Sequence, residues 1–209
     1  MIRFLPLLLL GCAKDEQTES LIEGSISVAD IGESADIAWN QAFYATKNGA
    51  MLAFITGVPG ANCPQIAEFL SSSDGATEKE GIYDGGGCVM TIKIDEWSSE
   101  YEASWPGEGW DPSAGTSIRC EFGAGEWERE TNSTGREDYY WTGTTWDGQP
   151  TVFDWRFSED EDAVELEMDM SAFEGDLIYE SSGQLAGTGE VSGTLRAEAC
   201  PALENAQVL

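Results

Sequence analysis

The sequence contains no histidine, and this absence restricts its chemistry more than any other feature. Without an imidazole there is no Ser-His-Asp or Cys-His nucleophilic pair, and no side chain of ordinary pKa that titrates near neutral pH. The commonest ligand of zinc and iron is missing as well. Histidine-dependent hydrolases and most transition-metal enzymes are therefore excluded.

Basic residues are also scarce, because 10 lysines and arginines stand against 39 aspartates and glutamates, for a net charge of −29. Such a chain repels nucleic acid and anionic lipid headgroups, so we expect no nucleic-acid partner. Hydrophobic residues nevertheless make up 41% of the chain and aromatic residues 11%. This is more than a disordered acidic tail contains, so the acids must decorate a folded body.

No hydrophobic run is long enough to cross a bilayer, which needs about 20 apolar residues in a helix. The run Phe4 to Leu10 has seven residues, follows Arg3 and ends in Leu9-Leu10-Gly11-Cys12. A basic and apolar leader that ends in Leu-x-Gly-Cys resembles the lipobox signal peptide of bacterial lipoproteins.

The resemblance implies that residues 1–11 are a signal peptide removed before Cys12, and that Cys12 carries the lipid. Ala13, the next residue, implies release to the outer membrane, so the chain would be anchored in the cell envelope on its periplasmic or surface face. Residues 12–24 would then be a lipidated N-terminus and polar tether. Residues 25–209 are expected to form a single acidic β domain.

Alternating apolar and polar residues predict β-strands through most of this body. The clearest segments are Met90–Ile94, Ile118–Phe122, Phe153–Phe157, Val164–Met170 and Leu185–Ala197. Their polar positions include many acids, which is typical of antiparallel sheets with one wet face. Asn48-Gly49 lies between two further apolar segments and predicts a β-hairpin turn.

One short helix is expected near residues 64–71. Pro64 suits the first helical turn, and Ile66, Phe69 and Leu70 recur at helical spacing before a run of serines. Short strands at hairpin spacing with a single early helix predict a mainly β fold, either an antiparallel β-sandwich or a partly closed barrel.

The four cysteines beyond the lipobox are Cys63, Cys88, Cys120 and Cys200. An even number in an exported chain predicts two disulfides, with three pairings open. We favour Cys63–Cys88 with Cys120–Cys200, although Cys120 has the inward parity of its strand and Cys200 the outward parity. A metal site is the rival interpretation, but the close C-x-x-C spacing of such sites is missing.

Three acidic segments could gather oxygen ligands for Ca²⁺, namely Asp84 before three glycines, Asp147-Gly148, and Glu159–Asp162. None has the spacing of an EF-hand loop, and Asp-Gly is ordinary turn chemistry. Ca²⁺ is therefore a conceivable but unsupported ligand, and we predict no metal site and no cofactor.

Seven of the eight tryptophans lie between Trp97 and Trp155. Trp105 and Trp110 stand in the segment 98–115, whose prolines, glycines and acids predict a long loop. Flat indole faces bind sugar rings or apolar protein surfaces, so these two residues are the candidate binding site for a glycan or an envelope protein. The alternative is that the segment folds back onto the core as a lid.

Two functions are compatible with these sequence features. The first is a membrane-anchored exported lipoprotein that acts as a non-catalytic binding or surface-structural module. The second is a secreted hydrolase of the glycosidase type, which needs only two carboxyl groups about 5–10 Å apart. Because the chain has 39 acids and no spacing singles out a pair, we name no catalytic residue. We favour the binding module.

Overall fold

The computed structural model describes residues 20–71, 87–106, 114–122, 127–131, 137–141, 143–177 and 184–205. The first strands are β1 (Leu21–Val28), β2 (Glu33–Trp39), β3 (Gln41–Lys47), β4 (Ala50–Thr56), β5 (Gly87–Ile94) and β6 (Glu100–Pro106). They are followed by β7 (Ala114–Phe122), β8 (Trp127–Thr131), β9 (Glu137–Trp141), β10 (Thr144–Asp160), β11 (Ala163–Leu177) and β12 (Leu185–Ala199). Helix α1 (Cys63–Ser71) follows β4, and a short 3₁₀ helix η1 (Pro201–Asn205) follows β12.

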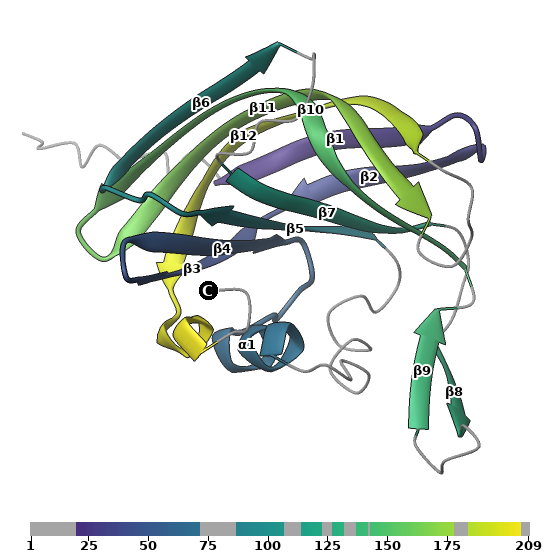
Figure 1. Cartoon of the computed structure of the whole chain (residues 1–209), viewed down its shortest axis with the longest axis horizontal. Helices are drawn as coiled ribbons and strands as arrows, with labels where there is room; N and C mark the ends of the chain where they lie inside the picture. Colours follow the sequence, from purple (N-terminus) through teal and green to yellow (C-terminus); the bar gives the residue numbers. More distant parts are fainter. Residues whose placement is uncertain are drawn as a thin grey trace, which may run out of the picture.

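Seven strands close into a barrel in the order β11-β10-β7-β5-β4-β3-β12, and β12 pairs back with β11 (Figure 1). Neighbouring strands are antiparallel except for β12 and β3, which run parallel over a short stretch. The prediction of a mainly β fold with one short helix is confirmed, and of the two architectures considered the barrel is the one found.

The remaining strands extend this barrel. β1 and β2 continue outward from β12, β6 pairs with β10, and β8 and β9 form a separate two-stranded ladder. β10 shares one edge between two partners, since it pairs with β7 as far as Gly148 and with β6 from Val152 onward. An irregularity in the register between Pro150 and Phe153 marks the change of partner.

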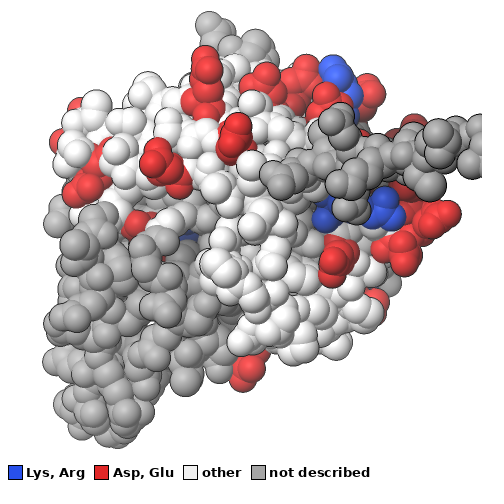
Figure 2. All heavy atoms as spheres, turned by 180° about the vertical axis from the view of Figure 1, so that it is seen from behind, with Lys and Arg blue, Asp and Glu red and all other residues white. Residues whose placement is uncertain are grey.

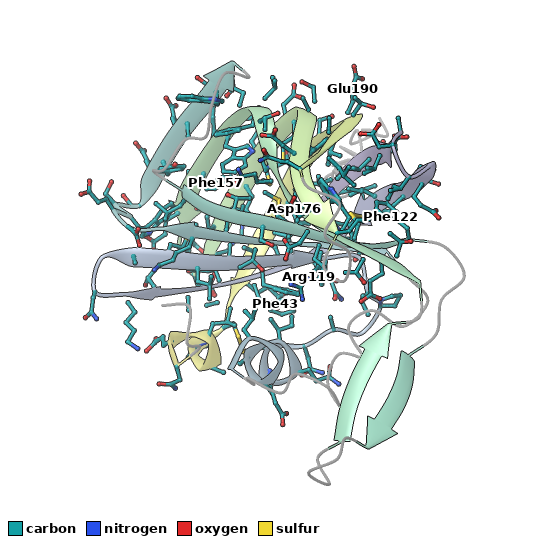
Figure 3. All side chains as sticks on the ribbon, turned by 45° about the vertical axis from the view of Figure 1, so that its right-hand side comes forward. Phe43, Arg119, Phe122, Phe157, Asp176 and Glu190 are labelled. Atoms are coloured by element: carbon teal, nitrogen blue, oxygen red, sulfur yellow. A yellow bond between two sulfur atoms is a disulfide. The ribbon has the colours of Figure 1, made fainter. Side chains whose placement is uncertain are left out.

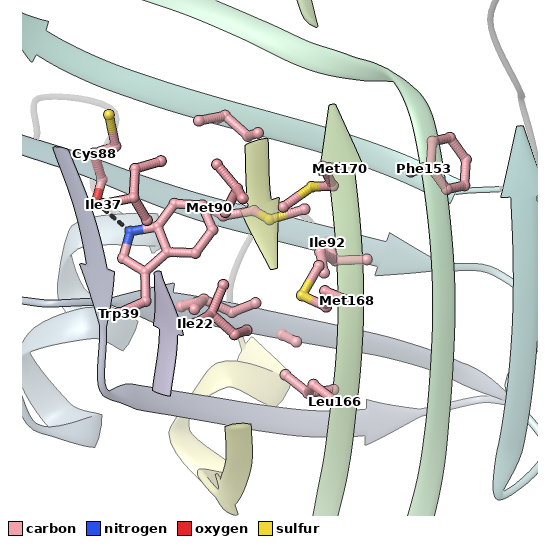
Figure 4. Packing of buried hydrophobic residues seen from close by; sticks show 14 of the residues in the cluster. Ile22, Ile37, Trp39, Cys88, Met90, Ile92, Phe153, Leu166, Met168 and Met170 are labelled. Carbon is pink, nitrogen blue, oxygen red and sulfur yellow. Dashed lines mark hydrogen bonds between the residues drawn. The ribbon is translucent and has the colours of Figure 1, made fainter. Parts of the chain in front are cut away.

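Apolar side chains fill the barrel interior, and Figure 4 shows part of this packing. The inward residues include Trp39, Met90, Trp155 and Met168, all at most 2% exposed. A second cluster lies outside the barrel, where Phe43 points from β3 toward α1 (Figure 3). Strands β3 and β4 are therefore buried on both faces, which explains their continuous apolar sequence.

The Asn48-Gly49 turn is confirmed, with φ angles of 55° and 85° that suit a hairpin between β3 and β4. Asp147-Gly148, in contrast, is not a turn, because both residues lie within β10. Gly148 serves packing instead: a Cβ there would lie 2.2 Å from the indole of Trp146. Gly175, its partner on β11, makes room for the same indole.

The predicted disulfide pairing is wrong, although all four cysteines are bonded. Cys88 pairs with Cys120, directly opposite on the neighbouring strands β5 and β7, and both side chains face the barrel interior. Cys63 pairs with Cys200 in the outer cluster, where it joins the start of α1 to the end of β12. The parity conflict between Cys120 and Cys200 thus has a simple cause, because the two side chains lie on opposite faces of the barrel wall.

Candidate functional site

A groove of about 290 Å³ crosses the outer face of β10, β11 and β12. Backbone pairing places its side chains in two transverse rows. The first row contains Asp154, Asp169 and Ser192, and the second contains Arg156, Glu167 and Thr194. Gly193 lies between the rows on β12 and adds no side chain, so the groove is open and polar.

Carboxylates dominate the electrostatics of this groove. Arg156 lies 3.6 Å from Asp154 and 3.6 Å from Glu167, and all three side chains are more than half exposed. Exposed ion pairs of this kind contribute well under about 1 kcal/mol each. Asp169 lies directly opposite Asp154, and like charges in facing positions repel. The groove therefore carries a net negative charge that favours a cationic or hydroxyl-rich ligand.

The same polarity continues onto β6. We call the outward side chains of β6 and of the adjoining parts of β10 and β11 the acidic face; it contains Glu100, Glu102, Asp154, Arg156, Glu165, Glu167 and Asp169. In this set, six carboxylates accompany a single base, Arg156. Figure 2, the view from behind, shows acidic groups spread over the surface and few basic ones.

The groove meets one geometric condition for glycoside hydrolysis, since several carboxyl groups lie within one or two strand spacings. A general acid, however, is normally withdrawn from water so that its pKa rises. Asp154 and Glu167 are 55% and 57% exposed on an open sheet face. The geometry thus supports ligand binding better than acid catalysis.

A second hollow, of about 390 Å³, lies between the start of α1, β3 and the end of β12. Asn62 caps the helix by accepting a hydrogen bond from the backbone N–H of Gln65 at 3.3 Å. Arg196, on the β12 side, lies 3.3 Å from Asp160 at the end of β10 and 3.8 Å from Asp162 in the β10–β11 turn. Arg196, the basic residue of this hollow, is therefore already paired with carboxylates, and Glu198 adds a negative charge to its lining.

A half-buried cluster joins β7 to β10. The Arg119 guanidinium donates to Asp147 at 2.8 Å, and the Ser117 hydroxyl donates to the other oxygen of the same carboxylate at 2.5 Å. Arg119 and Asp147 are each 32% exposed. All three residues hold the two strands in register, and this structural role accounts for the cluster without a ligand.

The structure describes only part of the predicted site. Trp105 lies on β6 and not in a loop, so the loop expected over 98–115 is wrong for Glu100–Pro106. Its indole packs against the interior cluster from the inner face of β6 and is partly buried. The indole Nε1 is buried and has no hydrogen-bond partner among the described residues. Trp110 and the lipidation residue Cys12 lie outside the described residues.

The acidic segments considered as Ca²⁺ ligands lie in different parts of the structure. Glu159 and Asp160 end β10, Glu161 and Asp162 form the β10–β11 turn, and all four are exposed, with Glu161 at a φ of 56°. Asp84 lies outside the described residues. Within the described ranges no group of three or more acids and cysteines is arranged to hold a metal ion. No helix in the same part of the chain is long and apolar enough to cross a membrane.

Sequence reasoning missed β2 and β6 and the residues that they position. Ile37 and Trp39 of β2 recur at alternate positions around Ala38, and Tyr101, Ala103 and Trp105 of β6 alternate with Glu102 and Ser104. The signal was present in both segments, but each is short and contains small or acidic residues. The edge position of β6 within the described part of the chain and the acidic face could therefore not be recognised beforehand.

Comparison with known proteins adds no family to this description. The chain matches no known protein family, no curated protein and no solved structure.

Proposed function

We propose that this chain is an exported, lipid-anchored lipoprotein whose β-barrel binds a partner without catalysing a reaction. The observation that carries the proposal is the use of the cysteines. Four of the five form two disulfides, which are typical of exported proteins. The cysteine left over is Cys12, the residue that the lipobox resemblance assigns to the lipid.

The start of the described chain supports an anchor close to the barrel. The Ser20 hydroxyl donates to the carbonyl of Thr194 at 3.3 Å and accepts from the backbone N–H of Arg196 at 2.9 Å. Ser20 is thus fixed to β12. Seven residues lie between it and Cys12, and the eight Cα-to-Cα steps span at most about 29 Å. A lipid on Cys12 would hold the β12 side of the barrel near the membrane surface.

The packing of the barrel supports binding at its outside. Large side chains fill the interior, and Trp146, Trp155 and Phe122 are at most 1% exposed there. The polar groove, in contrast, is open to water and lies on the outer face of β10, β11 and β12. An envelope protein or a glycan that contacts this face would meet both hydrogen-bond donors and hydrogen-bond acceptors.

A carboxylate-dependent hydrolase is the second candidate, and one observation favours it: Asp154, Glu167 and Asp169 line a common groove. In this case Asp154→Asn and Asp169→Asn would each abolish hydrolysis of a glycan without changing stability. Retained glycan binding in both variants, with no hydrolysis by the parent protein, would support the binding module instead.

Fractionation and cross-linking test the proposed function. The native protein should sediment with membranes and be released by detergent, whereas the Cys12→Ser variant should be soluble or unprocessed. Chemical cross-linking in envelope preparations should then capture a partner through groups on the outer face of the barrel. A native protein that stays soluble, or a Cys12→Ser variant that has lost residues 1–11 and still sediments with membranes, would contradict the anchor.

A further inference from the structure

We propose that the free edge of β6 binds an extended, lysine- or arginine-rich protein segment, which adds as a further strand to the sheet. The inference deepens the proposed function, because it assigns the binding module a contact surface and a class of partner. It rests on the backbone pairing of β6, on the charge of the acidic face and on the partial exposure of the aromatic residues of β6.

The pairing of β6 with β10 determines which backbone groups remain free. The amide of Glu159 donates to the carbonyl of Ser99 at 2.7 Å, so these two residues form a hydrogen-bonded pair. In an antiparallel ladder such pairs alternate with non-hydrogen-bonded pairs. It follows that Tyr101, Ala103 and Trp105 direct their backbone groups toward β10. Glu102 and Ser104 direct theirs away from it.

β6 is an edge strand in the part of the chain that the structure describes, because β10 is its one ladder partner there. Figure 1 shows it as the outermost strand on its side of the sheet. The amide of Glu100 bonds locally to Ser98, and Pro106 has no N–H. The edge available to a partner is thus short and centred on Glu102 and Ser104. An unpaired edge of this kind is a template for strand addition.

The carboxylates on and beside β6 determine which kind of segment can bind at this edge. Glu100 and Glu102 are exposed on β6, and the acidic face beside them has one base, Arg156. A second copy of the chain would bring its own Glu100 and Glu102 against these residues, and the whole chain carries a charge of −29. The same carboxylates attract a basic segment. Edge charges that prevent self-association therefore also favour lysine and arginine in a partner.

The two faces of β6 predict the pattern of the partner. Glu102 and Ser104 are exposed on the outer face, whereas Tyr101 and Trp105 on the inner face are only partly buried. Side chains of an added strand alternate in the same way. Its basic residues would extend the ladder of the acidic face, and its apolar residues would cover the remaining surface of Tyr101 and Trp105. The fitting segment therefore alternates basic and apolar residues.

The experiment uses the isotope-labelled Cys12→Ser protein in a soluble form without residues 1–11, and a capped seven-residue peptide that alternates lysine and valine. In the free protein the amides of Glu102 and Ser104 should exchange with solvent faster than those of Tyr101 and Ala103. The peptide should shift the Glu102 and Ser104 resonances and slow their exchange by at least about tenfold. Protected Glu102 and Ser104 amides in the free protein would overturn the proposal, because the edge would already be covered.

Variants and a modified peptide separate strand addition from simple charge attraction. Ser104→Pro removes an edge N–H but no bond to β10, and it should weaken binding at least about tenfold. Glu102→Lys should weaken it by a similar factor, while the matched control Glu190→Lys, on the exposed face of β12, should change it less than about twofold. A peptide N-methylated at alternate residues should not bind, and this comparison needs no variant of the protein.

Equal binding of the plain and N-methylated peptides, or equal loss in Glu102→Lys and Glu190→Lys, would overturn the proposal in favour of diffuse attraction. The proposed function is tested separately, because membrane fractionation and envelope cross-linking do not depend on β6. If the peptide fails while the native protein is lipidated and cross-links through another face, only the edge assignment is lost.

Discussion

The indole Nε1 of Trp39 on β2 donates a hydrogen bond of 2.7 Å to the backbone carbonyl of Cys88 on β5. No backbone ladder joins these two strands in the described part of the chain, since β2 pairs only with β1 there. The bond is buried, and Trp39 is 1% exposed (Figure 4). The Trp39 side chain therefore bonds β2 directly to β5 of the barrel wall, beside the Cys88–Cys120 disulfide, while β1 joins the wall through its ladder with β12.

Trp39→Phe should destabilise the protein by roughly 1–3 kcal/mol, because it leaves the Cys88 carbonyl without its donor and creates a small void. Trp97→Phe is the control, since Trp97 is only partly buried and its backbone bond to Gly49 is retained. We expect the control to cost less than about 1 kcal/mol. Denaturant unfolding followed by circular dichroism measures both, and equal losses would contradict the connecting role of Trp39.

The two disulfides should contribute unequally. The Cys63–Cys200 bridge closes a segment of 137 residues and the Cys88–Cys120 bridge one of 32. The loss of loop-closure entropy in the unfolded chain therefore predicts a stabilisation of roughly 5 kcal/mol by the first bridge and roughly 4 kcal/mol by the second. Unfolding of the two double-alanine variants tests this order. Peptide mapping of the oxidised protein should recover these two pairs, and recovery of Cys63 linked to Cys88 would contradict the structure.

Gly193 should tolerate no side chain. Its φ is +147°, and a Cβ at this position would lie 2.1 Å from the carbonyl oxygen of Leu21 on β1. Gly193→Ala should therefore cost at least about 2 kcal/mol through strain and loss of the β1–β12 ladder. Gly115→Ala is the matched control, because its Cβ would make an ordinary contact of 3.6 Å with the side chain of Lys93. Thermal unfolding of the pair should show a much lower melting temperature for Gly193→Ala alone.

Tyr44 should ionise late in an alkaline titration. Burial raises the pKa of its phenol above the usual 10.0, and the nearby charges of Glu159 and Asp162 raise it further. Because the folded pKa exceeds the unfolded one, its contribution to stability is complete below about pH 10 and is lost as the pH rises through the folded pKa. Absorbance at the phenolate band should show a late component that Tyr44→Phe removes. An unchanged titration in the variant would contradict this assignment.

The sequence predicted the strands whose apolar residues alternate without interruption. In β11, for example, Val164, Leu166, Met168 and Met170 face the interior, as their spacing indicates. Asn48-Gly49 likewise forms the expected turn. Periodicity fails where a strand changes partner or packs an unusual residue. Gly148 looks like a turn residue because the sequence does not reveal that the indole of Trp146 lies over it.

Disulfide pairing shows a limit of a different kind. Cys88 shares the parity of Met90 and Ile92, and Cys120 shares that of Ile118, so both were predictable as inward residues. This shared inward parity alone predicts a disulfide between Cys88 and Cys120. The predicted pairing instead joins the helix start to the next strand and an inner strand to the C-terminus. The candidate site was harder to predict, because the acidic face depends on which strands lie side by side, and single-sequence patterns do not determine strand order.

The most direct test of the central claim is mass spectrometry of the native protein purified from the membrane fraction. Lipidation at Cys12 predicts an N-terminal peptide that begins at Cys12, lacks residues 1–11 and carries the mass of attached acyl chains, while the four remaining cysteines stay in disulfides. A native protein with an unmodified Met1, or with Cys12 present as a free thiol, would contradict it.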